Sequence, residues 1–169
     1  MNEIIAKIEQ WGEDRNLIKG STPLDQGMKL FSEYGELCDA IAKNQIELIK
    51  DGIGDVLVVC TIISKQIDVP LTIDNLADLE LLEPKRYIVE LGFALNQFVY
   101  GTDSGDLSTL SEDKSIILST LDKVATAYGL TLQQCLEHAY NDIKDRRGLL
   151  HNGVFIKSDD PRYAELGGK

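Results

Sequence analysis

The fold of this chain is decided by residues 45–67, QIELIKDGIGDVLVVCTIISKQI. Apolar side chains recur along this stretch at alternating steps of three and four residues, namely at Ile46, Ile49, Ile53, Val56, Cys60, Ile63 and Ile67. The spacing predicts one helix that packs nearly antiparallel to its neighbours. From Val56 to Ile63 this helix is apolar on every side, which predicts burial all round. We expect a subunit interface to supply part of that cover, and therefore a homodimer or a homotetramer.

Helical patterns on both sides of this stretch predict a single all-α domain over residues 1–150, a bundle of about five to six helices with an antiparallel core. Thr22 and Pro23 are typical of an N-cap and a first helical position, and Thr131 with Gln134 is typical of a capping box. The helices other than 45–67 are expected over about residues 2–17, from Pro23 through Ile41, over 85–100, from Ser111 to Gly129, and from Thr131 to near Gly148.

Two further segments are expected to differ from this bundle. Residues 68–84 are interpreted as a linker with one short helix at most, because prolines stand near both ends and acidic residues fill the middle. Residues 151–169 are expected to form a C-terminal tail that is an extended or turn segment.

The composition excludes several classes of protein. The 169 residues are 43% hydrophobic and carry a formal net charge of −11, which fits one folded domain and is too apolar for a disordered chain. No apolar run approaches the roughly 18 to 20 residues of a membrane helix, and the first residues lack a signal-peptide pattern, so we expect a cytoplasmic protein without membrane contact. The acidic balance argues against duplex nucleic acid, which is bound mainly through cationic side chains.

The cysteines and histidines form no motif known to us for metal or redox chemistry. Cys38, Cys60 and Cys135 lie far apart within apolar helical patterns, which indicates buried free thiols. His138 and His151 make neither an H-E-x-x-H nor an E-x-x-H pair, so a zinc protease or a di-iron centre is not expected.

Acidic residues beside the apolar seams are the candidates for chemistry. Glu33 and Glu36 are three residues apart and share one face of their helix. Glu47, Asp51 and Asp55 are spaced four apart on one side of the next helix, and Asp55 lies directly before its apolar run. If the two helices pack antiparallel, carboxylates from both can converge, and a cluster of hard oxygen donors suits Mg²⁺ or Mn²⁺.

Simpler interpretations of the same acids stay open. A pair spaced like Glu33 and Glu36 is common on a solvated helix surface. Asp55 can instead bond a helix terminus or pair with a Lys or Arg side chain, because a lone buried charge costs several kcal/mol.

The order of these motifs resembles the MazG family of all-α nucleoside triphosphate pyrophosphohydrolases, in its phage and Gram-positive branch. The resemblance is carried by Glu33-x-x-Glu36, by residues 51–59 (DGIGDVLVV), by residues 135–148 (CLEHAYNDIKDRRG) and by residues 152–157 (NGVFIK). It covers about residues 8–67 and 131–158, whereas residues 70–130 match nothing in the family pattern and are interpreted as a variable middle segment.

The resemblance implies a Mg²⁺-dependent enzyme, with Mn²⁺ as a possible substitute, that cleaves a nucleoside triphosphate, (d)NTP, to (d)NMP and pyrophosphate. It implies three groups of site residues. The catalytic residues are Glu33, Glu36 and Asp55; the metal ligands are Glu33, Glu36, Asp51 and Asp55; the substrate-binding residues are Asn141, Lys144 and Arg147.

The chain departs from the family pattern at two acids. Gly52 stands where the pattern E-x-x-E…E-x-x-D has its third acid, and Asp51 is the substitute that we expect to act as a weaker ligand or as a base through water. Ser32 stands where many relatives have an additional glutamate.

Two other functions stay open at this point. One is a catalytically weak or inactive MazG-like helical oligomer that acts as a nucleotide-binding or regulatory protein. Gly52 is the best argument for this alternative. The other is a binding protein that sequesters a nucleotide or inhibits a host protein through its acidic face. Trp11, Arg15 and Lys29 are weaker site candidates, and Trp11 is expected to belong to the core.

Overall fold

The computed structural model describes residues 1–72, 76, 79 and 83–166 of the chain. Over these residues the protein consists of helices and one short hairpin, so the predicted all-α fold is confirmed. The elements are α1 (Asn2–Asp14), α2 (Leu17–Gly20), α3 (Pro23–Ala42), α4 (Ile46–Gln66), α5 (Pro84–Ser104), α6 (Leu110–Ala127), α7 (Leu132–Ile143), β1 (Gly148–His151), β2 (Val154–Lys157) and α8 (Pro161–Glu165).

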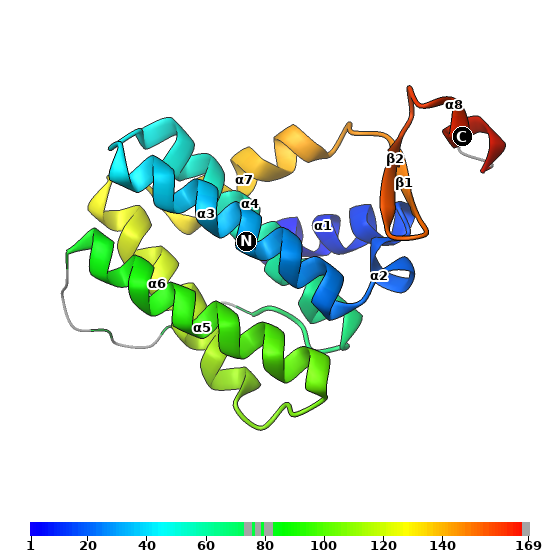
Figure 1. Ribbon diagram of the computed structural model, residues 1–169. Helices are drawn as coiled ribbons and strands as arrows, with labels where there is room; N and C mark the ends of the chain where they lie inside the picture. The colour runs from blue at the N-terminus through cyan, green and yellow to red at the C-terminus, as the bar shows by residue number, and fades with distance from the viewer. Residues whose placement is uncertain (73–75, 77–78, 80–82, 167–169) are drawn as a thin grey trace.

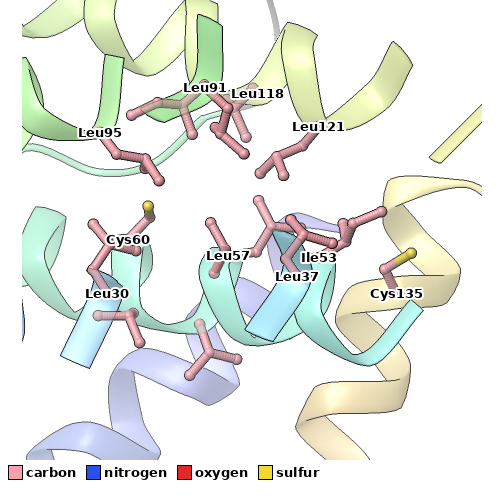
Figure 2. Packing of buried hydrophobic residues seen from close by; sticks show 14 of the residues in the cluster. Leu30, Leu37, Ile53, Leu57, Cys60, Leu91, Leu95, Leu118, Leu121 and Cys135 are labelled. Atoms are coloured by element: carbon pink, nitrogen blue, oxygen red, sulfur yellow. The ribbon is translucent and has the colours of Figure 1, made fainter. Parts of the chain in front are cut away.

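Helix α4 lies at the centre of the bundle. It contacts α1, α2, α3, α6 and α7, and α5 packs beside α6 and against α3 (Figure 1). Ile53, Leu57 and Cys60 of α4 are at most 1% exposed and face leucines of α3, α5 and α6 (Figure 2). The cover of the apolar stretch therefore comes from the chain's own helices and does not require a second subunit. A homodimer or homotetramer stays a prediction.

The helix ends follow the sequence signals closely at two sites. The Thr22 side chain accepts a hydrogen bond from the Asp25 backbone N–H, and Pro23 occupies the first helical position of α3. At α7, Thr131 and Gln134 form the predicted capping box. These caps fix where α3 and α7 begin, and both helices carry residues considered below.

Several predicted boundaries are wrong: the helix expected over 85–100 runs to Ser104, and the helix expected to end near Gly148 ends at Ile143. The helix expected over residues 2–17 is interrupted, because Asn16 takes a left-handed conformation (φ 57°) between α1 and α2. Ser111 does not cap α6: the helix already begins at Leu110 after Thr109, whose hydroxyl donates a hydrogen bond to Asp113. The short helix considered for residues 68–84 falls largely on residues 73–75, 77–78 and 80–82, which lie outside the described residues.

The tail folds back on itself as a hairpin of two extended strands joined by a turn. Strands β1 and β2 pair antiparallel around Asn152 and Gly153, which have the positive φ values that a two-residue hairpin turn requires. The backbone N–H of Leu150 donates to the Arg15 carbonyl at 2.9 Å, so the hairpin lies against the N-terminal helices (Figure 1). This contact brings Phe155 and Leu150 close to α1 and α2, although these helices are far away in the sequence.

None of the described helices combines the length and the apolar character that a membrane crossing requires.

Candidate functional site

A cavity of about 400 Å³ opens between the N-terminal helices, α3, α4 and the hairpin. This volume lies within the range of small-molecule sites. Its lining combines three acids, two cations and a large apolar wall. The lining residues are Trp11, Leu17, Ser21, Asp25, Gln26, Lys29, Glu33, Asp55, Val58, Val59, Ile62, Ile143, Arg146, Leu150, Gly153 and Phe155.

Two of the predicted site residues, Glu33 of α3 and Asp55 of α4, meet in this cavity. Glu33 is 5% exposed, and its carboxylate is bound by the ammonium group of Lys29, one turn earlier on α3. The pKa of Asp55 is raised from 3.8 to about 7, chiefly by burial and in addition by the negative charges of Glu33 and Asp51. Lys29 and Arg146 oppose this shift without cancelling it. The cavity thus holds more negative charge than its own cations balance.

The donor set at this place fits a hard divalent cation. Carboxylate oxygens are the ligands that Mg²⁺ favours, and an added positive charge would relieve the repulsion that, together with burial, raises the pKa of Asp55. In the described part of the chain, however, Glu33, Glu36 and Asp55 do not form a set of ligand atoms lying within 4.8 Å of one another. Lys29 is the cation that contacts Glu33 in this conformation.

The other two predicted metal ligands lie elsewhere. Glu36 is exposed and does not line the cavity. Asp51 also lies outside the lining, and its carboxylate is 3.4 Å from Nε2 of His138 on α7. Of the four acids in the predicted ligand set, the structure brings together Glu33 and Asp55.

The packing of α3 on α4 accounts for Gly52. A Cβ atom at this position would lie 3.1 Å from the Cβ and 3.2 Å from the Cα atom of Leu37. These contacts are tighter than ordinary van der Waals packing, and Leu37 itself is fully buried. A glutamate here would require α3 and α4 to move apart. The close crossing of the two helices therefore favours glycine at the position where the family pattern has its third acid.

The predicted substrate-binding residues lie outside the cavity lining. Lys144 donates a hydrogen bond to the Asn141 side chain at 2.8 Å, and both residues are exposed, as is Arg147. Arg146 is the basic residue of this segment that lines the cavity. The sequence offered one weak signal for it, a cluster of basic residues after a helix, and that signal does not distinguish Arg146 from Arg147.

A chain of contacts holds Arg146 in place. Arg15 donates from Nε to the Arg146 carbonyl at 2.7 Å, and its guanidinium lies over the Trp11 ring, 4.7 Å from the centroid. Trp11 in turn donates from its indole nitrogen to the Ile143 carbonyl at 2.8 Å. Trp11 is half-buried and packs against the core, and it also lines the cavity.

The raised pKa of Asp55 predicts a pH dependence of stability. The folded protein keeps a proton on Asp55 up to about pH 7, whereas the unfolded chain releases it near the ordinary value of 3.8. The free energy of unfolding should therefore fall between about pH 4 and pH 7 when no divalent cation is present. Urea unfolding across this range measures the fall, and Asp55→Asn should remove this contribution. An identical pH profile in the variant would contradict the assignment to Asp55.

Comparison with known proteins bears on the same two helices. Residues 22–78 match the model of the MazG nucleotide pyrophosphohydrolase domain. The match covers about a third of the chain, so the likeness to the MazG family is a likeness of this segment. The matched segment contains Glu33 and Asp55, which line the cavity. It also contains Glu36 and Asp51, which do not line the cavity.

A phage protein is similar in sequence to part of this chain. The "uncharacterized 18.2 kDa protein in rep-hol intergenic region" of Haemophilus phage HP1 (strain HP1c1) is 53% identical over 66 residues, which is 39% of this chain. The matched region spans 40% of that relative's own length. No solved structure matches the chain.

Proposed function

We propose that this protein is a Mg²⁺-dependent nucleoside triphosphate pyrophosphohydrolase that converts a (d)NTP to a (d)NMP and pyrophosphate. The observation that carries the proposal is that Glu33 and Asp55, from two helices of the MazG segment, face one cavity with an apolar wall. In this reaction water adds to the α-phosphorus, and pyrophosphate leaves.

The charge distribution of the cavity supports a metal-bound triphosphate as the ligand. Glu33 and Asp55 are the residues that would hold Mg²⁺. Mg²⁺ held there would supply Lewis acidity, which would polarise a water molecule and neutralise charge on the phosphate oxygens. Lys29 and Arg146 line the same cavity, and their cationic groups can pair with phosphate oxygens. Arg15, through the Arg146 carbonyl, positions the segment that carries Arg146.

The apolar wall supports a nucleobase as the other part of the ligand. Trp11, Val58, Ile62 and Phe155 come from α1, α4 and the hairpin and line this side of the cavity. Aromatic side chains pack favourably on the flat faces of rings. A ligand with one flat apolar end and one anionic end matches the two parts of the lining.

A screen for pyrophosphate release tests this proposal. The full-length protein is incubated with each canonical ribo- and deoxyribonucleoside triphosphate, with Mg²⁺ or with EDTA, and both products are identified by chromatography. We expect equal amounts of nucleoside monophosphate and pyrophosphate, and only with the metal present. Release of orthophosphate with a nucleoside diphosphate would contradict the bond assignment, and no turnover of any nucleotide would contradict the enzyme proposal.

A nucleotide-binding protein with little or no turnover is the second candidate function. It is favoured by the exposure of Glu36 and by the tight packing at Gly52, because both reduce the set of acids at the cavity. Nucleotide binding in the calorimeter, together with a negative result in the release screen, would support this candidate.

Phe155 provides a test of the apolar wall. We expect Phe155→Ala to raise KM for the triphosphate by about tenfold, because the loss of a contact worth about 1.5 kcal/mol is about one decade in affinity. Val154→Ala is the matched control, since Val154 is the neighbouring hairpin residue, is 52% exposed and does not line the cavity. Steady-state kinetics measure both variants, and equal KM values would contradict a nucleobase site at Phe155.

A further inference from the structure

Asp51, which the MazG resemblance assigns to the magnesium site, is part of a different group of side chains. His138 Nε2 lies 3.4 Å from Asp51 Oδ1 and 3.9 Å from Asp142 Oδ2. Each of the three residues offers one ligand atom, and these atoms all lie within 4.8 Å of one another. In the part of the chain that the structure describes, no other set of histidine, cysteine or carboxylate ligands meets this spacing. None of the three lines the cavity.

The close packing of α4 on α7 holds this group together. A Cβ atom at Gly54 would lie 2.3 Å from the Cys135 carbonyl oxygen and 2.7 Å from the Ala139 Cβ atom, so the two helices approach at a distance that requires glycine. Asp51 is one turn before Gly54 on α4, and His138 is one turn after Cys135 on α7. Asp142 follows His138 by four residues and so shares its face of α7.

The geometry matches the ligand spacing of a tetrahedral transition metal. Bonds from Zn²⁺ to imidazole nitrogen and carboxylate oxygen are about 2.0–2.2 Å long, so two ligands of a tetrahedral ion lie about 3.3–3.6 Å apart. The distance between His138 and Asp51 falls in this range. The side chain of Asp142 is 49% exposed, which leaves it free to turn closer to the other two ligands.

The surroundings leave the group open to an ion. Lys50, the cation next to Asp51 in sequence, is bound to Glu47 at 2.5 Å. The side chains of His138 and Asp51 are 34% and 38% exposed, so solvent can reach the site and complete the coordination. An imidazole ligand favours Zn²⁺ and similar transition metals over Mg²⁺.

We propose that Asp51, His138 and Asp142 form a binding site for a divalent transition-metal ion of the zinc class, separate from the cavity that holds Glu33 and Asp55. The site is absent from our interpretation of the sequence because its ligands come from two helices and make no short motif. It does not depend on the pyrophosphohydrolase proposal, because its ligands other than Asp51 have no part in that proposal.

Titration with Zn²⁺ in a calorimeter tests the site on the full-length protein, in a buffer without phosphate or chelator. A Cys38→Ser background removes the half-buried thiol as a competing ligand. We expect one ion per chain and at least about tenfold weaker binding after His138→Ala. His151→Ala is the matched control, since His151 is exposed on β1, and it should leave the dissociation constant unchanged within about twofold.

Two results would overturn the proposal: no saturable Zn²⁺ binding to the parent protein, or equal affinities of the His138→Ala and His151→Ala variants. Circular dichroism of each variant checks that α7 is folded. Should His138→Ala not fold, Asp142→Asn decides in its place, because this exposed residue can lose its charge without loss of packing. Unchanged Zn²⁺ affinity in Asp142→Asn would then overturn the three-ligand site. Neither readout involves nucleotide turnover, so the outcome is independent of the release screen.

Discussion

Asp55→Asn should lower pyrophosphate release by at least about a hundredfold, the largest effect that we expect from any single change at the cavity. The substitution keeps the size of the side chain and removes the charge that would hold the metal. The measurement is the initial rate at saturating nucleotide and Mg²⁺, with the triphosphate that the screen identifies as the best substrate.

Two comparisons separate this effect from a loss of folding. The same variant should be more stable than the parent above about pH 7 without divalent cations, because the parent then buries a charged Asp55. Asp122→Asn is the matched control: Asp122 is half-buried on α6 and does not line the cavity. If Asp55→Asn retains the activity of Asp122→Asn, Asp55 has no catalytic role.

Gly54→Ala should cause the largest loss of stability, about 3 kcal/mol in the free energy of unfolding. The added methyl group would meet the backbone oxygen of Cys135 at 2.3 Å, and a backbone carbonyl cannot turn away as a flexible side chain can. Helices α4 and α7 would have to separate. Urea denaturation followed by circular dichroism measures the change.

Gly35→Ala is the matched control for this prediction. Gly35 lies within α3, and a Cβ atom there would have no neighbour within 4 Å. The methyl group should therefore stabilise the protein by about 0.5–1 kcal/mol through helix propensity alone. A similar effect of both substitutions would show that the approach of α7 to α4 is looser than the structure indicates.

The helices could be predicted from the sequence because their signals are local. The spacing of Ile49, Ile53 and Cys60 predicts α4, and the side chains of Thr22 and Thr131 mark where α3 and α7 begin. The break at Asn16 was missed, because a left-handed residue leaves little trace in apolar periodicity. The hairpin was missed because its pairing and its contact with Arg15 are set by the tertiary fold.

The candidate site could be predicted in part. Glu33 and Asp55 were identified from acids placed beside two apolar seams, and the structure brings them to one cavity. The spacing of residues along a helix does not predict that Glu36 faces solvent or that Asp51 faces α7. Both orientations depend on how α3 and α4 are rotated about their own axes in the packed fold. The roles proposed for these acids stay predictions.

The proposed cation binding in the cavity that Glu33 and Asp55 line is tested most directly by Mn²⁺ titration of a His138→Ala protein, in which the proposed site on α7 has lost its imidazole. We expect Mn²⁺ to bind this protein saturably in the calorimeter and the additional substitution Asp55→Asn to abolish that binding. If Mn²⁺ binds equally well with and without Asp55, or does not bind the His138→Ala protein at all, the two acids do not form a metal site and the account is wrong.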